Sequence, residues 1–125
     1  MPRDLAEPAD ILRTLGMHPK YKGYAYMLSV LSITRLHPAY VYSITTHLYK
    51  SVAREFGTSL TSVERNIRFA IKRTWENGNK CELVRMFHVY DANYIPTNAE
   101  FIAVLTECMY NGRFQAPVQL TMSLN

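Results

Sequence analysis

The stretch VAREFGTSLTSVERNIRFAI, residues 52–71, reads as two helices joined by a short turn that contains glycine. Such a pair is typical of the helix-turn-helix, whose second helix enters the major groove of DNA. Gly57 permits a tight turn, and Ala53 is small at the position where the two helices cross. Asn66 lies where many such motifs have an apolar residue, so Ile67 has to supply that contact. The stretch therefore predicts a helix-turn-helix.

Apolar residues continue outward from this stretch at helical rather than alternating spacing, which indicates an all-α fold. Six helices are expected, over residues 8–15, 20–36, 44–56, 59–76, 81–87 and 98–110. Hydroxyl and amide side chains favour the first position of a helix, because they accept hydrogen bonds from its unpaired N–H groups. Thr58 or Ser59 is placed to cap the fourth helix, and Thr97 or Asn98 is placed to cap the last.

A length of 125 residues fits one domain with one small core. We expect an N-terminal extension over residues 1–10, a six-helix, bundle-like domain over 11–110, and a tail over 111–125. The tail alternates apolar and polar residues after Pro117, and a loose strand, a docking segment and disorder remain alternatives for it. No apolar run approaches the roughly 18 residues that span a bilayer, and the N-terminus lacks the order of a signal peptide. A cytoplasmic protein is therefore expected.

Positive charge is concentrated in the helix-turn-helix region. The chain has 14 Lys and Arg against 10 Asp and Glu, a formal net charge of +4. Residues 50–73 alone have a net charge of +4, because they contain Glu55 and Glu64 but also six basic residues: Lys50, Arg54, Arg65, Arg68, Lys72 and Arg73. A concentrated basic field is typical of a surface that binds phosphate. The alternative is an ordinary solvated helix face with paired charges.

The helix predicted over residues 59–76 has two chemically different faces at 100° per residue. One face is apolar and is expected to be buried: Val63, Ile67, Ala70, Ile71 and Thr74, with Trp75 at its edge. The opposite face carries Thr61, Ser62, Arg65, Phe69, Lys72 and Arg73, with Glu64 and Arg68 on its flank. Arginine can donate to guanine O6 and N7, glutamate can accept from cytosine N4, and the other cations can meet phosphates.

Two features of this polar face have simpler alternatives. Phe69 is an aromatic residue among polar ones, and it either touches a thymine methyl group or packs under a neighbouring loop. Glu64 and Arg68 are spaced as an i, i+4 surface ion pair, worth a few tenths of a kcal/mol. Such a pair does not exclude a role at DNA.

Four motifs occur in a characteristic order along the chain: KGYAY at 22–26, SVERNIRFAI at 62–71, WENGN at 75–79 and PTNAEFIA at 96–103. With them the chain resembles the C-terminal effector domain of the stage-zero sporulation protein A family, over roughly residues 11–110. The resemblance implies a six-helix DNA-binding domain that reads short promoter boxes, often as tandem or dimeric copies. It also implies communication with the sigma subunits of RNA polymerase, and a homodimer on DNA is one arrangement that follows.

The resemblance implies roles for individual residues. Glu64 and Arg65 match base-reading positions of the family, and Arg68 matches a DNA contact on the same helix. Segment 78–91 corresponds to the region that touches sigma.

Two departures from the family pattern bear on specificity. Ser62 stands where relatives carry a DNA-reading arginine, and Phe69 stands where they carry a histidine. Loss of a bidentate arginine contact changes binding by about 1–3 kcal/mol, so weaker affinity or altered specificity is expected at one base step. The predicted base readers are Glu64, Arg65, Ser62 and Phe69, and the predicted contacts to backbone or base are Arg68, Lys72, Arg73 and Thr61.

Other interpretations of the sequence lead to other classes of protein. Full-length relatives resemble two-domain response regulators with a phosphorylated receiver, for which 125 residues leave no room, so an excised domain or a stand-alone relative is expected. Ser62 and Phe69 also suit a protein-interaction module that kept the fold and lost DNA binding. No glycine-rich phosphate loop, GxSxG, HExxH or carboxylate pair occurs, so no enzyme is expected. Scattered histidines and two cysteines without CxxC spacing predict no metal site, no cofactor and no disulfide.

Overall fold

The computed structural model describes residues 6–89, 91 and 93–111, and this part of the chain contains helices and no strand. The elements are α1 (Pro8–Leu15), α2 (Lys22–Leu36), η2 (Pro38–Tyr42), η3 (Ile44–Tyr49), α3 (Lys50–Phe56), α4 (Leu60–Asn77), α5 (Lys80–Phe87) and α6 (Asn98–Asn111). The all-α prediction is confirmed, and each of the six predicted helices has a counterpart. The alternatives for the tail fall on residues 112–125, outside the described residues.

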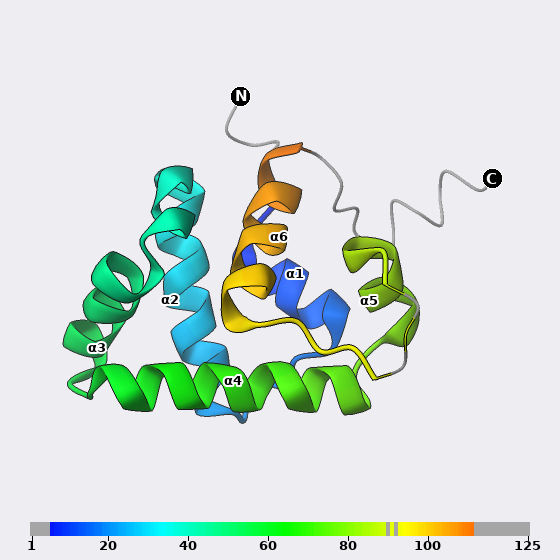
Figure 1. Ribbon diagram of the computed structural model, residues 1–125, viewed down its shortest axis with the longest axis horizontal. Coiled ribbons are helices and arrows are strands. Elements are labelled where there is room, and N and C mark those ends of the chain that lie inside the picture. Colours follow the sequence, from blue (N-terminus) through cyan, green and yellow to red (C-terminus); the bar gives the residue numbers. More distant parts are fainter. Residues whose placement is uncertain (1–5, 90, 92, 112–125) are drawn as a thin grey trace.

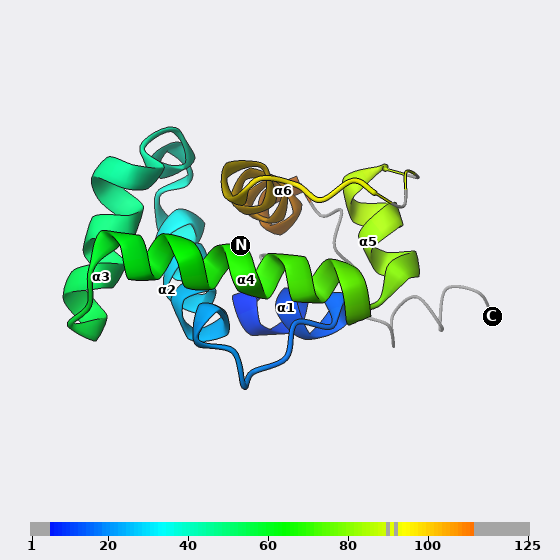
Figure 2. The same ribbon diagram turned by 60° about the horizontal axis from the view of Figure 1, so that its bottom comes forward.

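Helix α4 is the longest element and runs along the long axis of the molecule (Figure 1). Helix α3 lies beside its first end and α5 beside its last end, while α1, α2 and α6 stand over its inner side (Figures 1 and 2). The opposite side of α4 is left uncovered by other helices in both views. The fold therefore presents one long helix with one packed face and one open face.

The packed face of α4 agrees with the helical-wheel prediction at every position. All six predicted residues are buried: Val63, Ile67, Ala70, Ile71, Thr74 and Trp75. They belong to one hydrophobic core together with apolar side chains of three other helices: Ile11, Leu12 and Leu15 of α1, Met27, Val30 and Leu31 of α2, and Phe101, Ile102 and Leu105 of α6. The Trp75 ring packs edge-on against Phe87, with 4.9 Å between ring centroids, and so joins α5 to the core.

The helix caps resolve the two alternatives that the sequence left open. Ser59 caps α4, because its hydroxyl oxygen accepts a hydrogen bond from the Ser62 backbone N–H at 3.0 Å. Thr97 caps α6 in a reciprocal pair: its hydroxyl accepts from the Glu100 N–H at 3.1 Å, and the Glu100 carboxylate accepts from the Thr97 N–H at 2.9 Å. This capping box fixes the start of α6 beside α4.

The structure corrects the prediction between α2 and α3. The predicted helix over residues 44–56 is regular only from Lys50, because residues Ile44–Tyr49 form a wider π turn. Three successive β-branched residues, at 44–46, disfavour the α-helix there. A 3-10 turn at Pro38–Tyr42, which periodicity did not predict, begins at a proline whose fixed φ suits a helical first turn.

Candidate nucleic-acid interface

The predicted helix-turn-helix is formed by α3, a turn at residues 57–59 and α4. Gly57 has φ 64° and ψ 41°, a left-handed conformation that favours glycine, and the Thr58 N–H donates to the Ala53 carbonyl at 2.9 Å to end α3. Ala53 is buried at the crossing, as expected. Ile67 is fully buried and supplies the apolar contact that Asn66 lacks.

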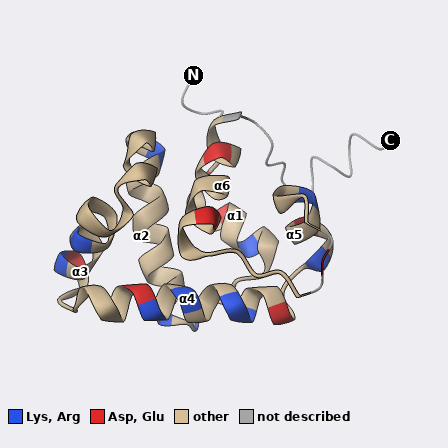
Figure 3. Ribbon diagram, in the orientation of Figure 1, with Lys and Arg blue, Asp and Glu red and all other residues tan. Residues whose placement is uncertain are grey.

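The open face of α4 is polar and carries exposed cations (Figure 3). Arg65 and Lys72 are exposed and make no hydrogen bond or ion pair with any residue that the structure describes. The same holds, among the described residues, for Lys50 and Arg54 on the neighbouring α3. Because these four side chains form no ion pair with the described residues, the alternative of an ordinary face with paired charges does not describe them.

Phe69 packs against a neighbouring turn, one of the two alternatives that the sequence gave for it, and the contact with a thymine methyl group stays a prediction. Its ring packs edge-on against Tyr21, in the turn before α2, with 5.6 Å between centroids and 85° between ring planes. The guanidinium of Arg73 lies over the same ring at 5.2 Å and pairs with Glu76 at 3.1 Å. Phe69 is nevertheless 47% exposed, so part of its ring still faces outward.

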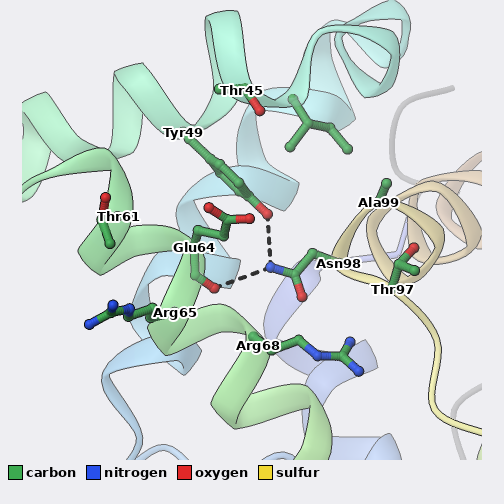
Figure 4. A pocket seen from close by; sticks show the side chains of 10 residues that line it. Thr45, Tyr49, Thr61, Glu64, Arg65, Arg68, Thr97, Asn98 and Ala99 are labelled. Atoms are coloured by element: carbon green, nitrogen blue, oxygen red, sulfur yellow. Dashed lines mark hydrogen bonds between the residues drawn. The ribbon is translucent and has the colours of Figure 1, made fainter.

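An open hollow of about 680 Å³ lies between α4, the π turn η3 and the start of α6 (Figure 4). Asn98 spans it: its amide nitrogen donates to the Tyr49 hydroxyl at 3.0 Å and to the Glu64 carbonyl at 3.2 Å. The Asn98 amide oxygen is buried and has no hydrogen-bond partner among the described residues. The amide thus ties three elements together on the flank of α4.

Arg68 and Ser62 are engaged within the fold, unlike Arg65. The Arg68 guanidinium donates to the Pro96 carbonyl at 2.5 Å and is half-buried, so it joins α4 to the segment before α6. The ion pair suggested for Glu64 and Arg68 is not formed among the described residues. The hydroxyl of the half-buried Ser62 accepts from the Asn66 amide at 3.3 Å.

A comparison with protein families decides the identity of this arrangement. The family model described as sporulation initiation factor Spo0A C terminal matches residues 9–109. The chain belongs to this family. The resemblance noted from the motifs is thereby confirmed, and the Spo0A C-terminal family is one of DNA-binding domains that regulate transcription in sporulation. No helix in the described part of the chain is long and apolar enough to cross a membrane.

In this Spo0A C-terminal domain, α5 (Lys80–Phe87) lies within the segment 78–91. The Asn79 side chain caps α5 by accepting from the Glu82 N–H at 3.3 Å, and the Lys80 ammonium donates to the Trp75 carbonyl at the end of α4. Cys81 is an exposed free thiol on this helix. The orientation of α5 is therefore set by the end of α4.

Sequence reasoning missed the residues that hold α4 from its flanks. Periodicity and capping preferences predict no role at the site for Tyr21, Tyr49 or Pro96, and they predict only a capping role for Asn98. The PTNAEFIA motif drew attention to Pro96 and Asn98 through the family resemblance, but their partners on α4 lie 28 and 34 residues away. Helical periodicity gives no information about such distant pairs.

Tyr49 makes the stability of this Spo0A C-terminal domain decrease with rising pH in the alkaline range. Burial raises the pKa of its hydroxyl above the usual 10.0, the hydrogen bond from Asn98 opposes the rise, and the Glu64 carboxylate adds to it. The folded chain therefore holds this proton more tightly than the unfolded chain. Its contribution to stability is complete below pH 10 and is lost as the pH rises through the folded-state pKa.

We expect the free energy of unfolding, measured with urea, to fall more steeply as the pH rises above 10 in the wild type than in Tyr49→Phe, because only the wild type loses the Tyr49 proton. The matched control is Tyr42→Phe, at a tyrosine that is 89% exposed, which should keep the wild-type dependence. Equal slopes for wild type and Tyr49→Phe would contradict the expectation.

Proposed function

We propose that the chain is a sequence-specific transcription regulator that reads a promoter box in the major groove with the open face of α4. The observation that carries the proposal is Arg65: it is exposed, has no partner among the described residues, and lies on a helix whose opposite face is wholly buried. A guanidinium in this state is available for a bidentate contact to guanine. The packed face gives α4 the rigidity that base reading requires.

The other predicted residues divide by their surroundings. Glu64 is exposed beside Arg65 and is proposed to accept from cytosine N4, and Phe69 is proposed as an apolar base contact. The Ser62 hydroxyl accepts from the Asn66 amide and keeps its hydrogen and one further lone pair to offer a base. Phosphates are proposed as the partners of Thr61, Lys72 and Arg73, and of Arg68 if its guanidinium exchanges the Pro96 carbonyl for DNA.

Protein partners are part of the same proposal. The exposed side of α5, at Lys80 and Cys81, is proposed to contact an RNA polymerase sigma subunit, and a homodimer is proposed on DNA with paired boxes. A promoter-binding regulator of sporulation acts in the cytoplasm, which is the proposed location.

A second candidate is a protein-interaction module of the same fold that has lost DNA binding. Two observations favour it: Arg68 is bound to the Pro96 carbonyl, and the serine at position 62 is half-buried. The first removes one cation from those that reach outward from α4, and the second limits the access of DNA to position 62. The exposed cations on α3 and α4 that have no partner within the described part of the chain favour the DNA-binding proposal.

A selection from random duplexes, followed by binding measurements over a range of salt, distinguishes the two candidates. We expect an enriched box, with affinity that falls steeply as salt rises, because each phosphate contact contributes a slope of about −0.9. Lys72→Ala should weaken binding to all duplexes alike and reduce the slope by about 1.

The matched control is Arg13→Ala, which removes a cation that is paired with Asp10 on α1 and should leave the slope unchanged. No enriched sequence and no salt dependence would favour the interaction module instead.

A further inference from the structure

Phe69 has packing partners on two sides although its side chain is half exposed. The Tyr21 ring, in the turn before α2, packs edge-on against the Phe69 ring, with 5.6 Å between the ring centroids. The Arg73 guanidinium, on the next turn of α4, lies 5.2 Å from the Phe69 ring centroid. Arg73 is itself held by Glu76 at 3.1 Å. An aromatic side chain that only faces solvent does not require an edge-on ring contact and a cation–π contact. Together these two contacts fix the direction in which the exposed part of the Phe69 ring points.

The position of Phe69 places this ring next to the proposed base reader. Phe69 follows Arg65 by four residues, so the two side chains lie on the same stripe of α4 about 6 Å apart along the helix axis. Base pairs in DNA are stacked about 3.4 Å apart. A helix that puts Arg65 on a guanine therefore brings Phe69 within about two base pairs of it.

The chemistry of the ring selects one group in the major groove. A phenyl ring neither donates nor accepts conventional hydrogen bonds, and the thymine 5-methyl is the apolar group that base edges present there. Cytosine at the same place would present an N4 amine that the ring leaves desolvated and unpaired. We infer that the braced Phe69 reads a thymine through its 5-methyl group, within two base pairs of the guanine read by Arg65; this inference rests on the proposed function.

Tyr21 acts as a positioning residue in this inference. It lies in the turn before α2, and its ring supports Phe69 from the side. Without this support the Phe69 ring can turn away from the groove, so discrimination should decrease while contacts made by Arg65 persist. A cationic neighbourhood, with Lys72 and Arg73 on the next turn, favours DNA over an apolar protein surface as the occupant.

Replacement of single thymines by deoxyuridine tests the inference, because it removes only the 5-methyl group. In the box obtained by selection, each thymine is replaced in turn and affinities are measured by competition. We expect one position, within two base pairs of the guanine that Arg65 reads, to lose about fourfold in affinity, the value of one buried methyl group. The same replacement should cost nothing in Phe69→Ala, and Tyr21→Ala should reduce the loss.

Three controls separate the inference from the proposed function. Phe69→Leu keeps an apolar side chain and should retain the methyl effect, whereas Lys72→Ala should weaken all duplexes equally. Unfolding curves establish that each variant is folded. If the wild type binds its box selectively and no deoxyuridine replacement reduces affinity, the inference is overturned while the proposed function stands. If no duplex is bound selectively, both are overturned.

Discussion

Replacing Arg65 with alanine is expected to remove the preference of the chain for its box while leaving the fold intact. The side chain is exposed and makes no hydrogen bond or ion pair with the residues that the structure describes, so its loss should not reduce stability. A bidentate contact to guanine is worth about 1–3 kcal/mol, which corresponds to a loss of about 5- to 150-fold in affinity for the box. Competition gel shifts at near-physiological salt measure it, with the box compared against a duplex in which that guanine pair is changed.

Two matched variants show whether the loss comes from base reading or from charge. Arg65→Lys keeps the positive charge but lacks the planar fork, so it should keep the salt dependence and lose the preference for guanine. Arg54→Ala removes an exposed cation from α3 and should weaken all duplexes by a similar factor. An Arg65→Ala variant that still prefers the box would mean that α4 does not read it through this residue.

The two faces of α4 were predictable because they depend on local periodicity. A repeat of 3.6 residues places Val63, Ile67 and Ala70 on one side, and any packed helix of this sequence would bury that side. The glycine of the turn and the cap at Ser59 are likewise local features, set by backbone conformation and by orphan N–H groups. The exposure of Arg65 follows from the same periodicity.

The engagement of the flanking residues was not predictable from periodicity. A helical wheel predicts the side of α4 on which Arg68 lies. It does not predict that this side contacts the Pro96 carbonyl, which is 28 residues away in the sequence. The pair Tyr21 and Phe69 has the same character, since an edge-on ring contact depends on how α2 crosses α4. The π turn before α3 also has no periodic signature, because it changes the period itself.

The crossing of α2 over α4 is set by Gly23, the second residue of α2. A Cβ atom at this position would lie 2.1 Å from the Asn66 carbonyl oxygen and 2.8 Å from the Ala70 Cβ atom. Backbone atoms of α4 would have to move to admit it, so Gly23→Ala should cost about 1–3 kcal/mol of stability through overpacking. Helix propensity alone predicts the opposite sign, because alanine stabilises a helix by about 1 kcal/mol relative to glycine.

The sign of the change in unfolding free energy therefore tests the crossing. We expect Gly23→Ala to lower the midpoint of thermal unfolding by roughly 4–12 °C, measured by circular dichroism. Ser32→Ala is the control, at an exposed position of the same helix. It raises helix propensity without bringing a new atom against α4, so the stability should stay equal or rise slightly. A Gly23→Ala chain as stable as the wild type would show that α2 does not approach α4 this closely. Because Asn66 and Ala70 share α4 with Arg65, a shift forced at Gly23 should also displace the reading face and weaken binding to the box.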